Sequence, residues 1–175
     1  YAHDLGATGF SIGILFGAFS LSRTVFLPYF GSVSDRAGRK PFLTAGLLAY
    51  FLASIAYMFS RDVVSLITVR LFQGIAAAMV MPVAQAYVGE ITPKGREGFT
   101  MGLLNVSVYA GLSAGPVLGG TAKDMLGIKA SFLSMGVLCA AALILCMVLL
   151  PPRRKEALLS RDRPREPVMM LLRNS

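Results

Sequence analysis

Charge is scarce in this sequence. Charged side chains make up 15% of its 175 residues, whereas a soluble domain usually carries about 25%. The long apolar stretches contain no aspartate or glutamate, and hydrophobic residues reach 55% of the chain. The charges that exist are gathered in short islands between these stretches. This pattern argues against a soluble domain and is typical of a polytopic membrane protein.

Residues that bind metals or carry out nucleophilic catalysis are also few. The chain has two cysteines and one histidine. Cys139 and Cys146 would lie about 10 Å apart on a helix, which is too far for a disulfide, so we expect them to pack as small apolar residues. His3 has no partner in the sequence, and no Gly-Lys-Ser/Thr order marks a phosphate loop. We expect neither enzyme activity nor a resident metal or cofactor.

What the sequence does contain is five apolar runs, each about as long as the 20 residues that a helix needs to cross a bilayer. The runs are too long and too uniformly apolar for the strands of a membrane barrel. The sequence therefore predicts an all-α membrane protein, with a bundle of five transmembrane helices within residues 1–152. We expect these helices at about 9–30, 41–60, 63–89, 98–122 and 130–152.

Lysine and arginine are distributed unequally among the links between these runs. The links 31–41 and 90–97 and the tail 153–175 together carry twelve of them, against three in the links that would face the other side. The positive-inside rule places the richer side in the cytoplasm. The net charge of +8 is thus explained by topology, and we expect the lipid bilayer as a partner and no nucleic acid.

This orientation puts Tyr1 outside the cell, although no signal peptide is recognisable before it. We therefore expect a first span that precedes this chain, so that residues 1–152 are spans two to six of a larger protein. The tail 153–175 is expected to be a basic, flexible cytoplasmic linker, with contact to anionic lipid as an alternative.

The link GSVSDRAGRKP packs four charges into six residues. Gly38 permits a turn that other residues disfavour, Gly31 would let another helix approach closely, and Asp35 can pair with Arg39 four residues on. The link resembles the cytoplasmic signature of the major facilitator superfamily. The matching positions are Gly31, Asp35, Arg36, Gly38, Arg39 and Lys40.

This resemblance implies a cytoplasmic latch that holds the two halves of a transporter together in its outward-facing state. Asp35 would face a helix of a carboxy-terminal half, and Arg39 would join a charge network within this half. Glu90, at the end of the third run, is the expected partner of Arg39. The alternative is a simple positive-inside anchor with a local ion pair.

Arg70 stands inside the third apolar run, where a cation costs about 2.5–3.5 kcal/mol to insert. Gln73 lies one turn away on the same face, and Gly74 followed by alanines offers a smooth surface for helix packing. The stretch resembles the fourth-helix signature of proton-coupled members of the same superfamily, which implies that Arg70, Gln73 and Gly74 belong to a proton-linked network. The alternative is a buried arginine bonded to carbonyls and to Gln73 without a transport role.

The fourth run carries a glycine ladder that includes a proline. Three of its glycines fall on one helix face and would let another helix touch the backbone, while the proline favours a kink. The string resembles the antiporter signature of drug:proton exchangers, which implies a pivot; generic helix packing is the alternative. The ladder consists of Gly111, Gly115, Pro116, Gly119 and Gly120.

Three further residues are candidates for a substrate cavity. Arg23 is a second cation inside an apolar run, beside serines and a threonine, and the alternative for it is snorkelling to an interface. Asn105 and Tyr109 lie upstream of the glycine ladder on the same run.

These resemblances imply a secondary transporter that moves small organic or drug-like molecules out of the cell in exchange for protons, by alternating access. Because the runs contain no acid, the proton carrier would lie in the missing first helix or the carboxy-terminal half, and the proton gradient would replace a cofactor. We expect the cytoplasmic membrane of a bacterium. An importer or uniporter of the same superfamily, or a non-transporting membrane scaffold, remain alternatives.

Overall fold

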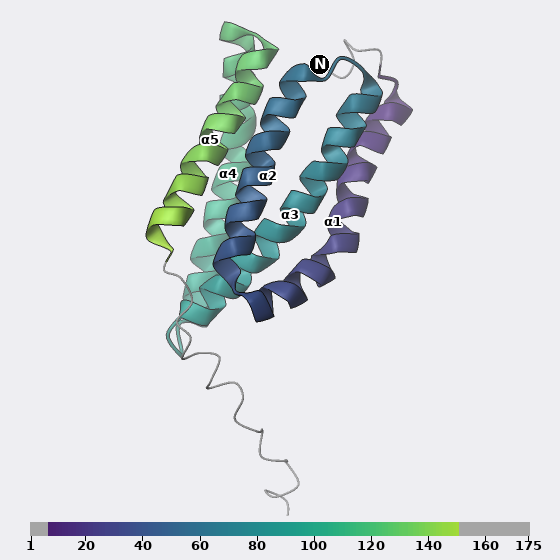
Figure 1. Ribbon diagram of the computed structural model, residues 1–175. Helices are drawn as coiled ribbons and strands as arrows, with labels where there is room; N and C mark the ends of the chain where they lie inside the picture. Colours follow the sequence, from purple (N-terminus) through teal and green to yellow (C-terminus); the bar gives the residue numbers. More distant parts are fainter. Residues whose placement is uncertain (1–6, 151–175) are drawn as a thin grey trace, which may run out of the picture.

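The computed structural model describes residues 7–150, and this part of the chain is helical with no strand in it. All five helices are long and apolar enough to cross a membrane (Figure 1), which confirms the expected all-α class. Their bounds are α1 Gly9–Ala37, α2 Arg39–Phe59, α3 Val63–Ile91, α4 Glu97–Leu126 and α5 Ile128–Leu149.

The helices do not end where the apolar runs end. α1 continues through the polar residues after Phe30 and stops only at Gly38, whose φ of 99° breaks the helix. The link that was expected to be a tight turn is therefore mostly helix, because polar residues do not by themselves stop a helix. α4 likewise reaches Leu126 before Gly127, with a φ of 87°, turns the chain into α5. The expected end of the last helix, at residue 152, lies outside the described residues.

The start of α3 is fixed by a capping box. The Asp62 carboxylate accepts the backbone N–H of Ser65 at 2.6 Å, and the Ser65 hydroxyl lies 3.4 Å from the Asp62 backbone nitrogen. These hydrogen bonds hold the pKa of Asp62 below its usual value. The cap satisfies backbone N–H groups in the first turn of α3 and thereby fixes where this helix begins.

α3 lies at the centre of the bundle. It packs mainly against α1 and α2, and α2 packs in turn against α5 (Figure 1). One core cluster, which includes Leu15, Tyr57 and Leu66, joins α1, α2 and α3, and a second joins Leu43, Val83 and Cys146 of α2, α3 and α5. α4 leans on α5, touches α3 less, and buries none of its own residues.

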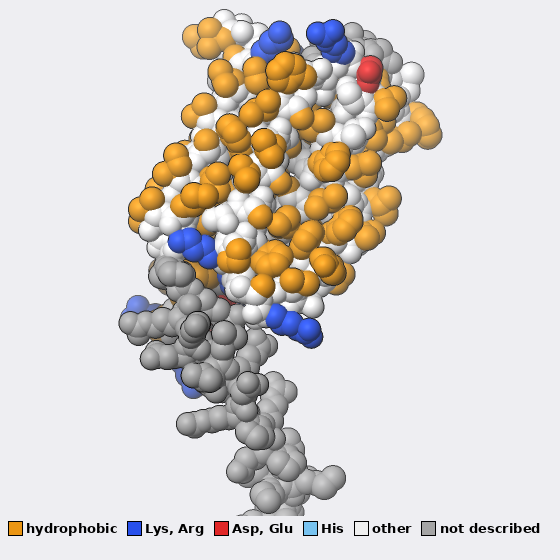
Figure 2. Space-filling model, in the orientation of Figure 1, with side chains coloured by type: hydrophobic (Ala, Val, Ile, Leu, Met, Phe, Trp, Pro, Cys, Tyr) orange, Lys and Arg blue, Asp and Glu red, His pale blue; other side chains and the backbone are white. Residues whose placement is uncertain are grey.

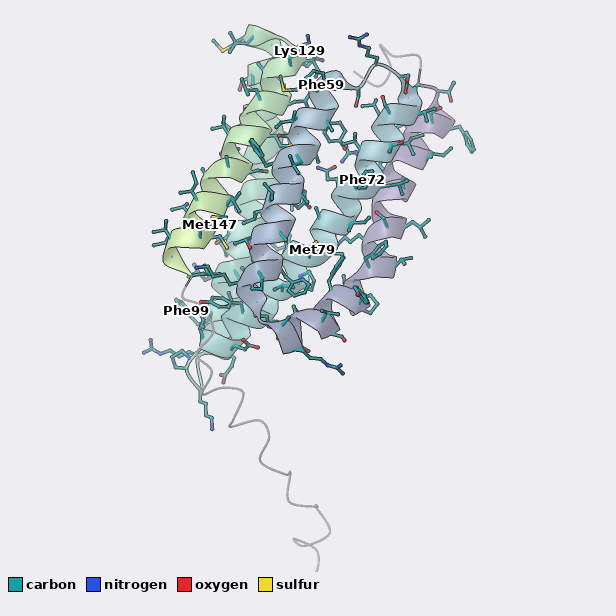
Figure 3. All side chains as sticks on the ribbon, in the orientation of Figure 1. Phe59, Phe72, Met79, Phe99, Lys129 and Met147 are labelled. Carbon is teal, nitrogen blue, oxygen red and sulfur yellow. The ribbon has the colours of Figure 1, made fainter. Side chains whose placement is uncertain are left out.

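The surface is apolar between two charged ends. Hydrophobic side chains form a broad band over the helices, while lysine and arginine lie at the ends of the bundle (Figure 2). Lys129 and Met147 mark the opposite ends of α5 (Figure 3). Such a band flanked by cations is what a multi-pass membrane protein presents to a bilayer. The end where α1 meets α2 is called the α1–α2 end below.

Candidate functional site

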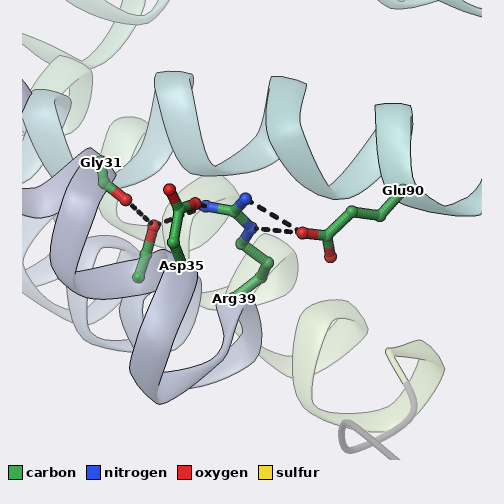
Figure 4. A network of polar contacts seen from close by, with 5 residues as sticks. Gly31, Asp35, Arg39 and Glu90 are labelled. Carbon is green, nitrogen blue, oxygen red and sulfur yellow. Dashed lines mark hydrogen bonds and ion pairs between the residues drawn. The ribbon is translucent and has the colours of Figure 1, made fainter. Parts of the chain in front are cut away.

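Arg39 is the centre of a polar network at the α1–α2 end (Figure 4). Its Nε and Nη2 donate to the same Glu90 oxygen, Oε1, at 3.2 and 3.0 Å. Its Nη1 donates to the Ser34 hydroxyl at 2.8 Å and also pairs with the Asp35 carboxylate. The guanidinium therefore connects the end of α1, the start of α2 and the end of α3.

The Arg39 network is only partly shielded from solvent. The Arg39 side chain is 11% exposed, but those of Asp35 and Glu90 are 41% and 47% exposed. Ion pairs with this much solvent contact usually contribute about 0–1 kcal/mol each. These contacts position the three side chains, and they are weak enough to be exchanged for other contacts.

Lys40 binds the end of α5 instead of the Arg39 network. Its Nζ donates to the carbonyl oxygens of Met147, at 2.8 Å, and of Leu150. These carbonyls belong to the last turn of α5, where a helix has acceptors without intrahelical partners. Lys40 thus ties the start of α2 to the end of α5 rather than joining the Arg39 network.

Gly31 and Arg36 make little contact within residues 7–150. A Cβ added to Gly31 would meet nothing within 4 Å, so the close helix approach expected there is absent from the described part of the chain. The Gly31 carbonyl accepts the Ser34 hydroxyl at 2.8 Å. Arg36 is exposed in the last turn of α1.

Arg70 and Gln73 meet inside the bundle. Arg70 Nη1 donates to Gln73 Oε1 at 3.0 Å, and the same oxygen accepts the Tyr57 hydroxyl at 2.9 Å. The Arg70 guanidinium carbon also lies 5.8 Å from the ring centroids of both Phe16 and Tyr57, within the range of a cation–π contact. Within residues 7–150 the cation contacts one amide oxygen and two aromatic faces.

Sequence reasoning missed Tyr57 in this cluster. Its ring stacks on Phe132 of α5 at a centroid distance of 5.1 Å, while its hydroxyl binds Gln73 of α3. The available signal was a tyrosine within an otherwise apolar run, since a buried tyrosine hydroxyl usually finds a partner. The identity of that partner depends on how α2 and α3 pack.

Gly74 lies at the seam between α1 and α3. A Cβ on it would stand 2.0 Å from the Ser22 hydroxyl oxygen and 2.4 Å from the Phe19 carbonyl oxygen. Ser22 itself donates to the Leu71 carbonyl at 2.9 Å. Gly74 is therefore a packing residue: the backbones of α1 and α3 lie so close together there that a larger side chain would not fit.

Arg23 lines a cavity of about 240 Å³ bounded by α1, α2, α3 and α4. Asn105 and Tyr109 do not line this cavity, and both are exposed. Val108, their neighbour on α4, takes that place. The cavity is lined by Phe19, Arg23, Tyr50, Ala77, Val80, Met81 and Val108.

The glycine ladder faces open space. A Cβ at any of its four glycines would meet nothing within 4 Å in the described residues, and Pro116 lies inside the continuous helix α4. Within residues 7–150 the space where these side chains would stand is open, while the Gly119 carbonyl accepts the Ser131 hydroxyl of α5 at 2.6 Å. Cys139 and Cys146 are both free thiols.

Comparison with known proteins identifies relatives of this chain. A family model described as Major Facilitator Superfamily matches residues 1–174. The chain is 41% identical over 145 residues to the uncharacterized MFS-type transporter MJ1560 of Methanocaldococcus jannaschii, covering 83% of this chain and 38% of that protein. It is 28% identical over 155 residues to the quinolone resistance protein NorA of Staphylococcus aureus, covering 89% of this chain and 40% of NorA. The chain thus spans about two fifths of the length of these relatives.

Proposed function

The chain belongs to the Major Facilitator Superfamily, and we propose that it is part of a proton-driven exporter of small organic, drug-like molecules. The resemblance of the α4 glycine ladder to an antiporter signature supports export, as does the similarity to a protein named for quinolone resistance. Protons entering the cell would drive the substrate outward by alternating access. The proposed location is the cytoplasmic membrane of a bacterium.

The observation that carries this proposal is the cluster of Arg70, Gln73 and Tyr57 within the bundle. A cation at membrane depth is costly to insert and usually faces a bundle interior or a water-filled cavity. Here the amide oxygen of Gln73 fixes one guanidinium nitrogen and leaves the others for a further partner. Arg70 would lower the affinity of a nearby acid for its proton, and that acid lies outside residues 7–150.

The proposed transporter is larger than this chain. Residues 1–152 would supply spans two to six of an amino-terminal half, which would work with a first helix and a carboxy-terminal half. This proposal is supported by the share of the relatives' length that the chain covers. Two half-transporters rocking about a central site is the usual architecture of alternating access.

In this larger protein the α1–α2 end would be the cytoplasmic latch. Arg39 holds Asp35 in place on the surface through its ion pair, while Glu90 fixes Arg39 from the side of α3. Asp35 would then meet a helix end of the other half when the cytoplasmic side is closed. Because these pairs are partly exposed and weak, the latch could open in each transport cycle.

The glycine ladder of α4 would be the moving surface. Its open backbone allows a second helix to approach closely, and Pro116 removes one intrahelical hydrogen bond. A helix that has a face without side chains and lacks one backbone hydrogen bond is suited to slide or bend against a neighbouring helix. α4 would therefore change its contacts between the two states.

Transport in inverted membrane vesicles tests the proposal. Vesicles that contain the full-length transporter are energised to acidify their interior, and uptake of a fluorescent drug is followed. We expect accumulation that collapses with a protonophore and is lost in Arg70→Ala at equal protein level. Accumulation only under the opposite gradient would indicate an importer, and no transport under either gradient would indicate a scaffold.

A further inference from the structure

Arg23 lies at the midpoint of α1, equally far from Gly9 and Ala37. The apolar part of α1 ends at Phe30, so at 1.5 Å per residue about 10 Å of helix separates Arg23 from the polar end of α1 and about 21 Å separates it from Gly9. The Arg23 side chain lines a cavity between α1, α2, α3 and α4, so snorkelling along a lipid-facing surface does not explain the charge. Arg23 is therefore a cation within the membrane-spanning bundle.

The two membrane-depth arginines differ in their partners. Arg70 has the Gln73 amide and two aromatic rings. Within residues 7–150, Arg23 has neither a hydrogen bond nor an ion pair, although it is close enough to interact electrostatically with Tyr50. The neighbouring Ser22 hydroxyl is already engaged with backbone carbonyls.

The surroundings of Arg23 define what could neutralise it. Its cavity has two aromatic walls, Phe19 and Tyr50, and the remaining lining residues are aliphatic or methionine. The described membrane-depth segments contain no carboxylate that could pair with it. At about 240 Å³ the cavity is smaller than the 300–1,000 Å³ typical of drug-sized sites, so it would take one end of a ligand.

We propose that Arg23 binds the carboxylate of the transported molecule, and that Phe19 and Tyr50 flank an adjacent aromatic ring. This inference rests on the proposed function and names its substrate class. A guanidinium presents two parallel N–H groups that match a carboxylate, and a low-dielectric cavity strengthens the contact. The substrates are aromatic carboxylic acids, including zwitterions, and permanent lipophilic cations are disfavoured.

Equilibrium binding to the full-length transporter in detergent tests this assignment without requiring transport. The probes are 1-pyrenebutyrate and its uncharged methyl ester, which differ only at the carboxylate, together with tetraphenylphosphonium as the cation. We expect the wild type to bind the carboxylate at least tenfold more tightly than the ester, and tetraphenylphosphonium more weakly than either.

Variants then assign the preference to Arg23. Arg23→Gln should weaken carboxylate binding about tenfold or more, as expected for the loss of a hydrogen bond to a charged group, and leave ester binding unchanged. Arg23→Lys, which keeps the charge, should recover part of the preference. Arg61→Gln, a cation beyond the end of α2, is the matched control and should have no effect.

Several outcomes would overturn the assignment. Equal binding of acid and ester by the wild type, which needs no variant, would do so. Equal weakening of both probes by Arg23→Gln would show that the cation has a structural role. If selectivity for the carboxylate depends on Arg23 but proton-driven export is absent, the binding assignment stands and the proposed function fails.

Discussion

Two glycine-bearing faces of the bundle have opposite surroundings. Gly74 of α3 is pressed against α1, with backbone and hydroxyl oxygens where its side chain would be. Gly115 of α4 stands at the centre of the glycine ladder and has nothing within 4 Å of the same position. Gly74 therefore allows α1 and α3 to pack closely, whereas the ladder glycines leave the space beside α4 open within the described residues.

We propose separate roles for the two faces. The helices around α3 are interlocked by close backbone contacts and polar bonds, as expected of a unit that moves as one body. α4 buries no residue of its own, and within residues 7–150 the space beside its ladder glycines is open, although Ser131 of α5 bonds the Gly119 carbonyl.

Gly74→Ala should have the largest effect. The new Cβ would lie 2.4 Å from the Phe19 backbone oxygen, which cannot move without shifting α1, and overpacking of this kind typically costs about 1–3 kcal/mol. We expect a clear fall in the melting temperature in detergent. Gly17→Ala on α1, which meets nothing within 4 Å, is the control, and equal melting of the two variants would contradict the seam.

Gly136→Ala should have an intermediate effect. Its Cβ would meet the Ser54 hydroxyl oxygen at 2.6 Å, and a hydroxyl can rotate away where a backbone carbonyl cannot. Rotation would disturb the 2.7 Å hydrogen bond from Ser54 to the Phe51 carbonyl, which is worth about 1 kcal/mol. The same melting measurement should place this variant between Gly74→Ala and the wild type; a loss as large as that of Gly74→Ala would be against the explanation.

Glu90→Gln should cost less stability than either packing variant. Arg39 would keep Ser34 and Asp35, and the lost pair is partly exposed, so we expect about 1 kcal/mol or less. If the network is a latch, however, the vesicle transport rate should fall by more than the stability loss explains. Unchanged transport with unchanged melting would reduce the pair to a surface contact.

Gly115→Ala should cause no loss of stability, because its Cβ enters open space and alanine favours a helix over glycine by about 1 kcal/mol; we expect an equal or slightly higher melting temperature. Transport should nevertheless fall severalfold if the ladder is a moving surface. Gly102→Ala is the matched control, since it also enters open space but lies on the opposite face of α4. Equal transport by both variants would count against the pivot.

Local patterns in the sequence predicted much of this arrangement. Apolar run length predicted five membrane helices, and the spacing of three residues between Arg70 and Gln73 put them on one face, where their hydrogen bond lies. The pairing of Arg39 with Glu90 was expected from the family resemblance, which implies a charge network for Arg39, and from the position of Glu90 at the end of the third run.

Features that depend on helix packing could not be predicted in this way. The hydroxyl of Tyr57 binds a residue on another helix, and Lys40 reaches the far end of the chain's last described helix. The glycine spacing on α4 gives no information about which helix packs against that face. Helix ends were misjudged because Ser34, Asp35 and Arg36 are polar yet remain helical until Gly38.

The central claim is that the ladder face of α4 changes its surroundings during transport. The direct measurement is the rate at which a small membrane-permeant thiol reagent labels Gly115→Cys in full-length transporter lacking other reactive cysteines, with and without a proton gradient. The account predicts a severalfold change in rate on energisation at position 115 and none for Gly102→Cys. Identical rates at position 115 in both conditions, in protein that still transports, would contradict it.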